Sequence, residues 1–231
     1  KLVVPLADGR ERVVRVVRRE LRLPGSLALE CENDGSAVLS KTAVAASALV
    51  PTQQVLLPGL TEAHFMDLPI LRDTDDAPGF YLAGASSSSG WRGAVAYRSR
   101  DAGATYESLV ALSDGAVIGT TAGALAPAAP WYPDEASSVI VNLLNPGDTL
   151  ASISNIELLN GANAAAIGNE IVQFRTATLL APGQYQLSGL LRGRKGTEDA
   201  IAGHAAGDRF VLLSAPGIVR PVLETGEFNI E

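Results

Sequence analysis

The chain has very few of the residues that hold small folds together covalently or through a metal. It contains one cysteine and two histidines among 231 residues. A lone Cys31 cannot form an internal disulfide, which excludes a secreted scaffold held by disulfides. His64 and His204 lie far apart in the sequence, and neither has a cysteine or paired carboxylate at zinc-ligand spacing. We therefore expect no metal centre and no cofactor.

Long apolar runs and common catalytic signatures are also missing. No stretch approaches the roughly 20 residues of a membrane-spanning helix, so we expect no membrane insertion. The sequence has no G-x-S-x-G, P-loop or G-x-G-x-x-G pattern, which removes the commonest hydrolase and nucleotide-binding interpretations. Asp73–Asp76 offers oxygen ligands for calcium, but without the later Gly and Glu of an EF-hand loop a solvated acidic turn is favoured. We expect a protein that is not an enzyme.

Acidic residues outnumber basic ones, 25 to 18, and the net charge of −7 repels nucleic acid. We therefore expect no nucleic-acid partner. The charge is uneven, since residues 1–22 carry +4 and the remainder −11. Arg15, Arg18, Arg19 and Arg22 are interpreted as the solvated side of a strand rather than a phosphate site, because no glycine-rich cradle accompanies them.

Turn residues between short apolar runs are what the sequence does contain. Its 23 glycines and 13 prolines have the spacing of strands joined by turns. We predict an all-β fold: an antiparallel β-sandwich or barrel-like domain with very little helix. Strands are expected at Val13–Val17, Ser26–Glu32, Gln54–Leu57, Gly79–Ala83, Ala94–Ser99, Tyr106–Leu112, Ala116–Thr120, Ser138–Leu143, Glu170–Leu179, Gln184–Leu191 and Arg209–Leu213.

Helix and loop are predicted only locally. Short helical turns are expected at Thr61–Met66 and Glu198–His204, where acidic residues precede a short apolar run. Gly84–Gly90, with its four consecutive serines, and Ala122–Pro133, rich in Ala and Pro, are expected to be exposed loops.

The domain organisation is interpreted as two segments. A Pro-Gly pair breaks the strand pattern near residues 58–68. We expect residues 1–62 to form an N-terminal β segment, which can be the end of a preceding domain, and residues 63–231 to form the main β domain. The chain starts at Lys1 and stops at Glu231 without a tail or capped helix, so both ends are expected to lie inside a longer polypeptide.

The segment Ser99–Tyr106 resembles the Asp-box of sialidases and related propellers, with Tyr where Trp is usual. In that motif the Asp side chain accepts hydrogen bonds from turn amides and the aromatic ring packs beneath it. Sialidase-like proteins carry several copies and an arginine cluster, whereas this chain has one copy and no such framework. We therefore interpret Ser99, Asp101, Gly103 and Tyr106 as a structural hairpin.

Aromatic residues make up 5% of the chain, and most are expected in the core. Trp91, Trp131 and Tyr132 could stack on sugar rings if they lie exposed on one face. The last two lie in a Pro-rich loop and are the pair most readily expected to be exposed. A carbohydrate-binding β-domain for bacterial surface polysaccharide is therefore a second hypothesis. A glycan hydrolase would need two facing carboxylates, and no spacing identifies them.

A motif near the C-terminus supplies a family resemblance. Gly189–Glu198 reads as a strand ending in Leu-Leu-Arg-Gly-Arg-Lys-Gly-Thr, and it resembles the large tail-tip proteins of siphophages and bacterial gene transfer agents, the host-specificity or baseplate hub proteins. The similarity covers about residues 65–215. The other segments that carry it are Asp67–Leu71, Gly90–Ala94, Ser99–Gly103, Gly168–Arg175 and His204–Phe210.

The resemblance implies a structural virion component at the tail tip, made in the bacterial cytoplasm and involved in tail assembly and host-surface attachment. Its implied partners are other tail proteins, copies of itself in a homotrimer of the whole protein, and a host surface glycan. From the residues themselves, the loop after Gln184–Leu191 carries Arg192, Arg194 and Lys195, which would either contact an acidic surface of a neighbouring subunit or remain solvated. Glu170, if buried, is expected to accept backbone hydrogen bonds or to pair with Arg192 or Arg194.

Overall fold

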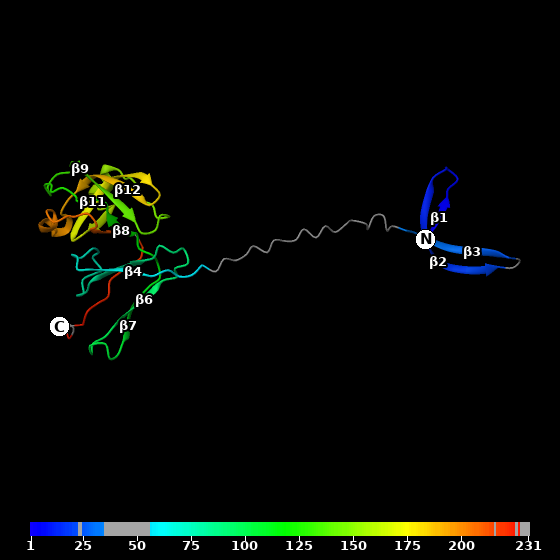
Figure 1. Ribbon diagram of the computed structural model, residues 1–231, viewed down its shortest axis with the longest axis horizontal. Helices are drawn as coiled ribbons and strands as arrows, with labels where there is room; N and C mark the ends of the chain where they lie inside the picture. The colour runs from blue at the N-terminus through cyan, green and yellow to red at the C-terminus, as the bar shows by residue number, and fades with distance from the viewer. Residues whose placement is uncertain (23–24, 35–55, 215, 225, 227–231) are drawn as a thin grey trace. The chain divides into compact units, whose positions relative to one another are not determined.

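The computed structural model describes residues 1–22, 25–34, 56–214, 216–224 and 226. The chain divides into two compact units, Lys1–Gln53 and Gln54–Glu231, and each is described by itself. Strands dominate both units, and all the strand pairs run antiparallel (Figure 1). The predicted all-β fold with very little helix is confirmed.

The first unit contains an amphipathic three-stranded sheet in the order β1-β2-β3. Leu2 faces Val14 across one strand pair, and Val14 is buried. Arg15 faces Glu32 across the other pair and forms a salt bridge of 3.6 Å with it. Because successive side chains of a strand point to opposite faces, one face is apolar and the other charged. The strands are β1 (Leu2–Pro5), β2 (Glu11–Arg22) and β3 (Ser26–Asn33).

The second unit is built around a closed six-stranded barrel in the order β10-β11-β12-β9-β8-β13 (Figure 1). The predicted hairpin is its longest pairing, with Phe174 opposite Leu190. Both of these side chains belong to one buried cluster, together with Val141 and Phe210. The strands are β8 (Ile118–Thr121), β9 (Asp134–Leu143), β10 (Ala164–Ile167), β11 (Glu170–Ala181), β12 (Gln184–Leu191) and β13 (Arg209–Leu212).

Barrel residues that are next in sequence to members of this first cluster belong to a second buried cluster. Ile171 and Val211 belong to it, together with Met66 and Tyr81 of a separate three-stranded sheet. That sheet has the order β14-β5-β4, and a two-stranded hairpin, β6-β7, completes the unit. The barrel wall is therefore covered on one side by a second layer of strands. The strands are β4 (Glu62–Met66), β5 (Tyr81–Ala85), β6 (Ala94–Arg98), β7 (Glu107–Leu112) and β14 (Ile218–Val219).

Two local predictions are wrong. Thr61–Met66 is not helical, because its residues pair with β5 as strand β4. The α-helix of the described residues is instead α2 (Asn155–Leu159), whose capping box joins Ser154 and Glu157. Gly84–Gly90 begins inside β5, and Ser86 is buried. The predicted strand Gln54–Leu57 lies partly outside the described residues.

The segment after β12 contains two short 3₁₀ turns, η1 (Arg194–Gly196) and η2 (Glu198–Ala200). The second one lies in the region where a helical turn was predicted. Thr197 connects the two turns, and its hydroxyl accepts a hydrogen bond of 2.9 Å from the Ile171 amide. This segment is thereby held against the start of β11.

Candidate functional site

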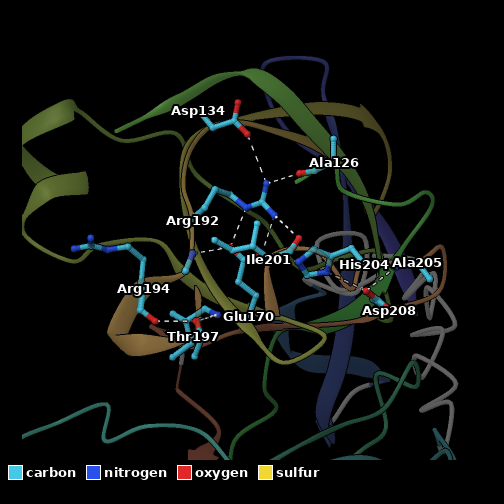
Figure 2. A network of polar contacts seen from close by, with 12 residues as sticks. Ala126, Asp134, Glu170, Arg192, Arg194, Thr197, Ile201, His204, Ala205 and Asp208 are labelled. Carbon is cyan, nitrogen blue, oxygen red and sulfur yellow. Dashed lines mark hydrogen bonds and ion pairs between the residues drawn. The ribbon is translucent and has the colours of Figure 1, made fainter. Parts of the chain in front are cut away.

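The densest cluster of buried charge lies where β11 begins and β12 ends (Figure 2). We call it the Glu170 network and define it as Glu170, Arg192, His204, Asp134 and Asp208. Glu170 is the first residue of β11, and Arg192 directly follows β12. Because β11 and β12 form a hairpin, their open ends meet and bring these two side chains together. Both side chains are fully buried.

Glu170 and Arg192 form a two-pronged ion pair. Arg192 donates from Nε to Oε1 and from Nη2 to Oε2 of Glu170, both at 2.9 Å. The amide of Gly193 donates to the same Oε1 at 2.6 Å. On its other side Arg192 donates to the Ala126 carbonyl at 2.7 Å and lies 3.6 Å from Asp134 Oδ2. This arrangement satisfies the expectation that a buried Glu170 pairs with Arg192 and accepts from the turn backbone.

His204 joins the pair to a second carboxylate. Its Nε2 lies 2.5 Å from Glu170 Oε2, and its Nδ1 lies 3.0 Å from Asp208 Oδ2. The hydrogen bond to Glu170 raises the pKa of His204 above its ordinary value, against the opposing effect of burial. Burial alone would raise the pKa of Glu170, but the bonds from His204 and Arg192 outweigh it and lower that pKa. Both shifts favour the charged forms, an imidazolium beside a carboxylate.

Glu170 is enclosed by its partners in this network. Arg192, His204 and the Gly193 amide already engage Glu170, and no solvent reaches it. A general base must reach its substrate's proton directly or through one water, and a carboxylate enclosed in this way does neither. The network instead joins the ends of β11 and β12 to the segment that leads to Asp208. Among the described residues, no group of three or more His, Cys, Asp or Glu could hold a metal ion.

The predicted subunit-contact loop requires a correction. Arg192 does not project from the loop, because it is fully buried against Glu170. Arg194 is half-buried and donates from Nε to Gln173 Oε1 at 2.9 Å. Lys195 is exposed, and its ammonium donates to the Ile70 carbonyl at 3.1 Å. The loop therefore uses its three positive charges within its own unit.

The predicted Asp-box hairpin is partly confirmed. Asp101 accepts hydrogen bonds from the amide and hydroxyl of Thr105, at 2.8 and 2.6 Å, inside the β6-β7 hairpin. The Gly103 amide donates to Ser99 Oγ at 2.8 Å. Tyr106 is 67% exposed, so its ring is not buried as expected, although its hydroxyl lies against Gly103 of the turn. The polar part of the motif stabilises the hairpin without a buried ring.

The three candidate sugar-binding aromatics do not share a groove. Trp131 and Tyr132 are 81% and 56% exposed, as predicted for the Pro-rich loop. Trp91 is half-buried, and its indole Nε1 donates to Thr61 Oγ1 at 2.9 Å. The cavity that Trp91 lines includes neither of the other two aromatics. Any sugar site therefore involves Trp91 or the exposed pair, and not all three.

Sequence reasoning missed the three remaining members of the Glu170 network. His204 was considered only as a zinc ligand, although it lies within one of the segments that carry the family resemblance. Asp208, four residues after His204, was the sequence signal for a partner of this histidine. Its carboxylate also accepts a hydrogen bond from the Ala205 amide at 3.0 Å and so forms a turn that orients the imidazole. Asp134 gave no signal of its own.

Comparison with known protein families gives a match over part of the chain. A sequence profile described as "Rcc01698-like, C-terminal" matches residues 116–211. The match coincides with the closed barrel and contains every member of the Glu170 network. No curated protein sequence matches the chain. None of the helices in the described part of the chain combines the length and apolarity that a membrane crossing requires.

Proposed function

We propose that this chain is a structural part of a phage-like tail-tip or hub protein, which acts in tail assembly and host-surface attachment and is not an enzyme. The sequence resemblance to tail-tip proteins is the starting point. Its most specific motif ends β12 and supplies Arg192 and Gly193 to the Glu170 network. The most specific part of the resemblance therefore includes residues that are buried at the end of the barrel.

The observation that carries the proposal is the amphipathic sheet of the first unit. Leu21 and Leu27 are paired across β2 and β3, and they are 81% and 53% exposed. Leu2, Leu29 and Cys31 line the same apolar hollow. Nothing among the described residues of that unit covers this face. Exposed apolar patches rimmed by polar residues are typical of protein–protein contacts, and we assign this face to contacts with copies of the chain or other tail proteins.

The largest set of ionisable groups in the described residues is enclosed in the barrel end, where it stabilises the fold. An adhesive or assembly module needs rigid strands and surfaces, and it needs no acid–base pair facing a substrate.

The test uses the full-length protein in cells that encode it and that produce tailed particles. A variant with Leu27→Glu and Leu29→Glu places two charges on the apolar face, while Ala28→Lys changes the opposite face. Particles are purified by sedimentation and their proteins identified by mass spectrometry. We expect the wild type and Ala28→Lys in the particles and the double variant missing from them. Absence of the wild-type protein from all particles would overturn the proposal.

Carbohydrate binding is a second candidate function, favoured by the exposure of Trp131 and Tyr132. Their loop is anchored, because the Ala126 carbonyl accepts a hydrogen bond from the buried Arg192. Two adjacent aromatic rings on an anchored loop could stack on the apolar face of a sugar. Binding of the chain to a bacterial glycan array, compared with Trp131→Ala, tests this candidate, and no binding by the folded chain contradicts it.

A further inference from the structure

A small cavity at Trp91 has the composition of a ligand site that neither proposed function uses. It measures about 200 Å³ and is lined by side chains from the end of β5 and from two separate loops. Sites for drug-sized ligands measure roughly 300–1,000 Å³, so this cavity fits one small polar molecule. The lining residues used below are Ser86, Ser88, Ser89, Trp91, Asn145 and Asp148.

Trp91 forms a fixed aromatic wall of this cavity. Its indole N–H is held by Thr61 Oγ1 at 2.9 Å, and its backbone amide donates to the Ser88 carbonyl at 3.1 Å. A Cβ atom added to Gly115 would lie 3.5 Å from Cζ3 of the ring, so the backbone at Gly115 packs against the indole edge. A ring held at its nitrogen and at its edge is preorganised to stack on an apolar surface.

Asn145 and Asp148 supply the polar side. Asn145 donates from Nδ2 to Asp148 Oδ1 at 3.0 Å, and its own Oδ1 accepts from the Gly147 amide at 3.0 Å. These bonds orient the half-buried Asp148 carboxylate, whose pKa is raised by burial. Its second oxygen, Oδ2, makes no hydrogen bond to any described residue. That oxygen is available to accept hydrogen bonds from a ligand.

The serine run supplies further hydrogen-bonding groups. Ser86 is buried, and its Oγ accepts from the Ser88 amide at 3.2 Å. Ser88 Oγ donates to the Leu57 carbonyl at 2.8 Å and accepts from the Gly90 amide at 3.2 Å. Ser89 also lines the cavity. The segment expected to be an exposed loop therefore forms a polar wall around Trp91.

We infer that this cavity binds a single neutral sugar ring. The apolar face of the ring would lie on Trp91, while adjacent hydroxyls would donate to Asp148 and exchange hydrogen bonds with the serines. A quaternary ammonium group would use the tryptophan and the carboxylate but has no N–H to donate to the serine hydroxyls. The inference rests on the carbohydrate-binding candidate and is independent of tail-tip assembly, and it assigns the site to Trp91 and not to the Trp131–Tyr132 pair.

The experiment is saturation-transfer NMR of the full chain with glucose, galactose, mannose, rhamnose and N-acetylglucosamine, with choline as the cationic comparison. Affinities for any sugar that binds are measured by titration. Variants are Trp91→Ala, Asp148→Asn, which keeps the shape but removes the charge, and Trp131→Ala as the matched control. Circular dichroism shows that each variant is folded.

We expect at least one sugar to bind, Trp91→Ala to abolish the binding, Asp148→Asn to weaken it by about tenfold or more, and Trp131→Ala to leave it unchanged. Binding that is lost in Trp131→Ala and kept in Asp148→Asn would overturn this site while supporting the carbohydrate-binding candidate. No binding of any sugar by the folded chain, or binding of choline alone, would overturn the inference.

Discussion

Arg192 and Glu170, 22 positions apart in the sequence, face each other through two hydrogen bonds of 2.9 Å with neither side chain open to solvent. The pair closes the end of the β11-β12 hairpin. Breaking a buried ion pair by removing one partner is costly because the other charge remains buried without compensation. The stability of the barrel should therefore depend more on this contact than on any exposed ion pair.

Arg192→Met should lower the free energy of unfolding by about 3–5 kcal/mol, because Glu170 then stays buried with one cationic partner fewer. Arg194→Met is the matched control, since its guanidinium is half-buried and Nε makes one bond, to Gln173. Arg194→Met should lower the free energy of unfolding by about 0.5–1.5 kcal/mol. Urea unfolding followed by tryptophan fluorescence measures both, and equal losses would contradict the assigned role of the pair.

The stability of the chain should depend on pH through His204. Its folded pKa lies above the ordinary value of 6.5, chiefly because of the hydrogen bond to Glu170 and also that to Asp208, and against burial and the charge of Arg192. The folded state thus binds the proton more tightly than the unfolded state. The stabilisation by His204 is fully present below pH 6.5 and is lost as the pH rises through the folded pKa.

His64 is a control, because its effect on the pH dependence of stability has the opposite sign to that of His204. Burial is the main cause that lowers its pKa, with Arg209 adding to it and Glu62 opposing it. The unfolded state then binds this proton more tightly, so the contribution of His64 improves as the pH rises. Thermal unfolding of the wild type, His204→Gln and His64→Gln between pH 5 and 9 measures both slopes. Parallel curves for the wild type and His204→Gln would contradict the assignment of the imidazolium.

The turn after β12 should tolerate a methyl group at one glycine and not at another. Gly193 and Gly196 both have positive φ, 57° and 86°. A Cβ at Gly193 would lie 2.9 Å from Glu198 Cα, whereas a Cβ at Gly196 would meet nothing within 4 Å. Gly196→Ala should cost about 1–2 kcal/mol from backbone strain, and Gly193→Ala about 1–3 kcal/mol more from overpacking. Equal unfolding midpoints in urea would refute this difference.

The Asp101 turn should act locally. Its hydrogen bonds with Thr105 lower the pKa of Asp101 from 3.8 to about 2, so its contribution is present above pH 3.8 and is lost as the pH falls from there through the folded pKa. Asp101→Ala should speed hydrogen exchange and proteolysis across Ser99–Tyr106 while leaving the global unfolding midpoint nearly unchanged. Asp101→Asn keeps an oxygen for the Thr105 amide and should behave more like the wild type. Identical exchange in all three proteins would argue against the predicted role of the turn.

The fold class and the central hairpin were predictable because turn residues and strand runs alternate along the chain. The Glu170–Arg192 pairing was also predictable, since the hairpin register brings the start of β11 to the end of β12. A barrel was one of the two predicted architectures, but the sequence did not decide between a sandwich and a closed barrel. Closure depends on β10, whose sequence Ala164–Ile167 is too short and too alanine-rich to indicate a strand, and whose pairing with β13 is distant in sequence.

Other features that the sequence analysis predicted wrongly or did not predict have identifiable physical causes. The acidic and apolar residues of Glu62–Met66 suggested a helical turn, but pairing with Tyr81–Ala85 decides the structure, so tertiary contact overrides local pattern. Helix α2 was signalled by the Ser154–Glu157 capping box, which sequence analysis passed over. The polar wall around Trp91 could not be foreseen, because Asn145 and Asp148 reach it only through the fold.

The central proposal is that the chain belongs to the tip of a phage-like tail, and its most direct test is where the protein lies on a particle. Gold-labelled antibody fragments raised against the full chain would be applied to purified tailed particles from the cells that encode it and imaged by electron microscopy. The proposal predicts gold at the tail end opposite the head, with labelling abolished by prior addition of the free chain. Gold on heads or along the tail shaft, or unlabelled particles alongside abundant protein in the cell, would contradict it.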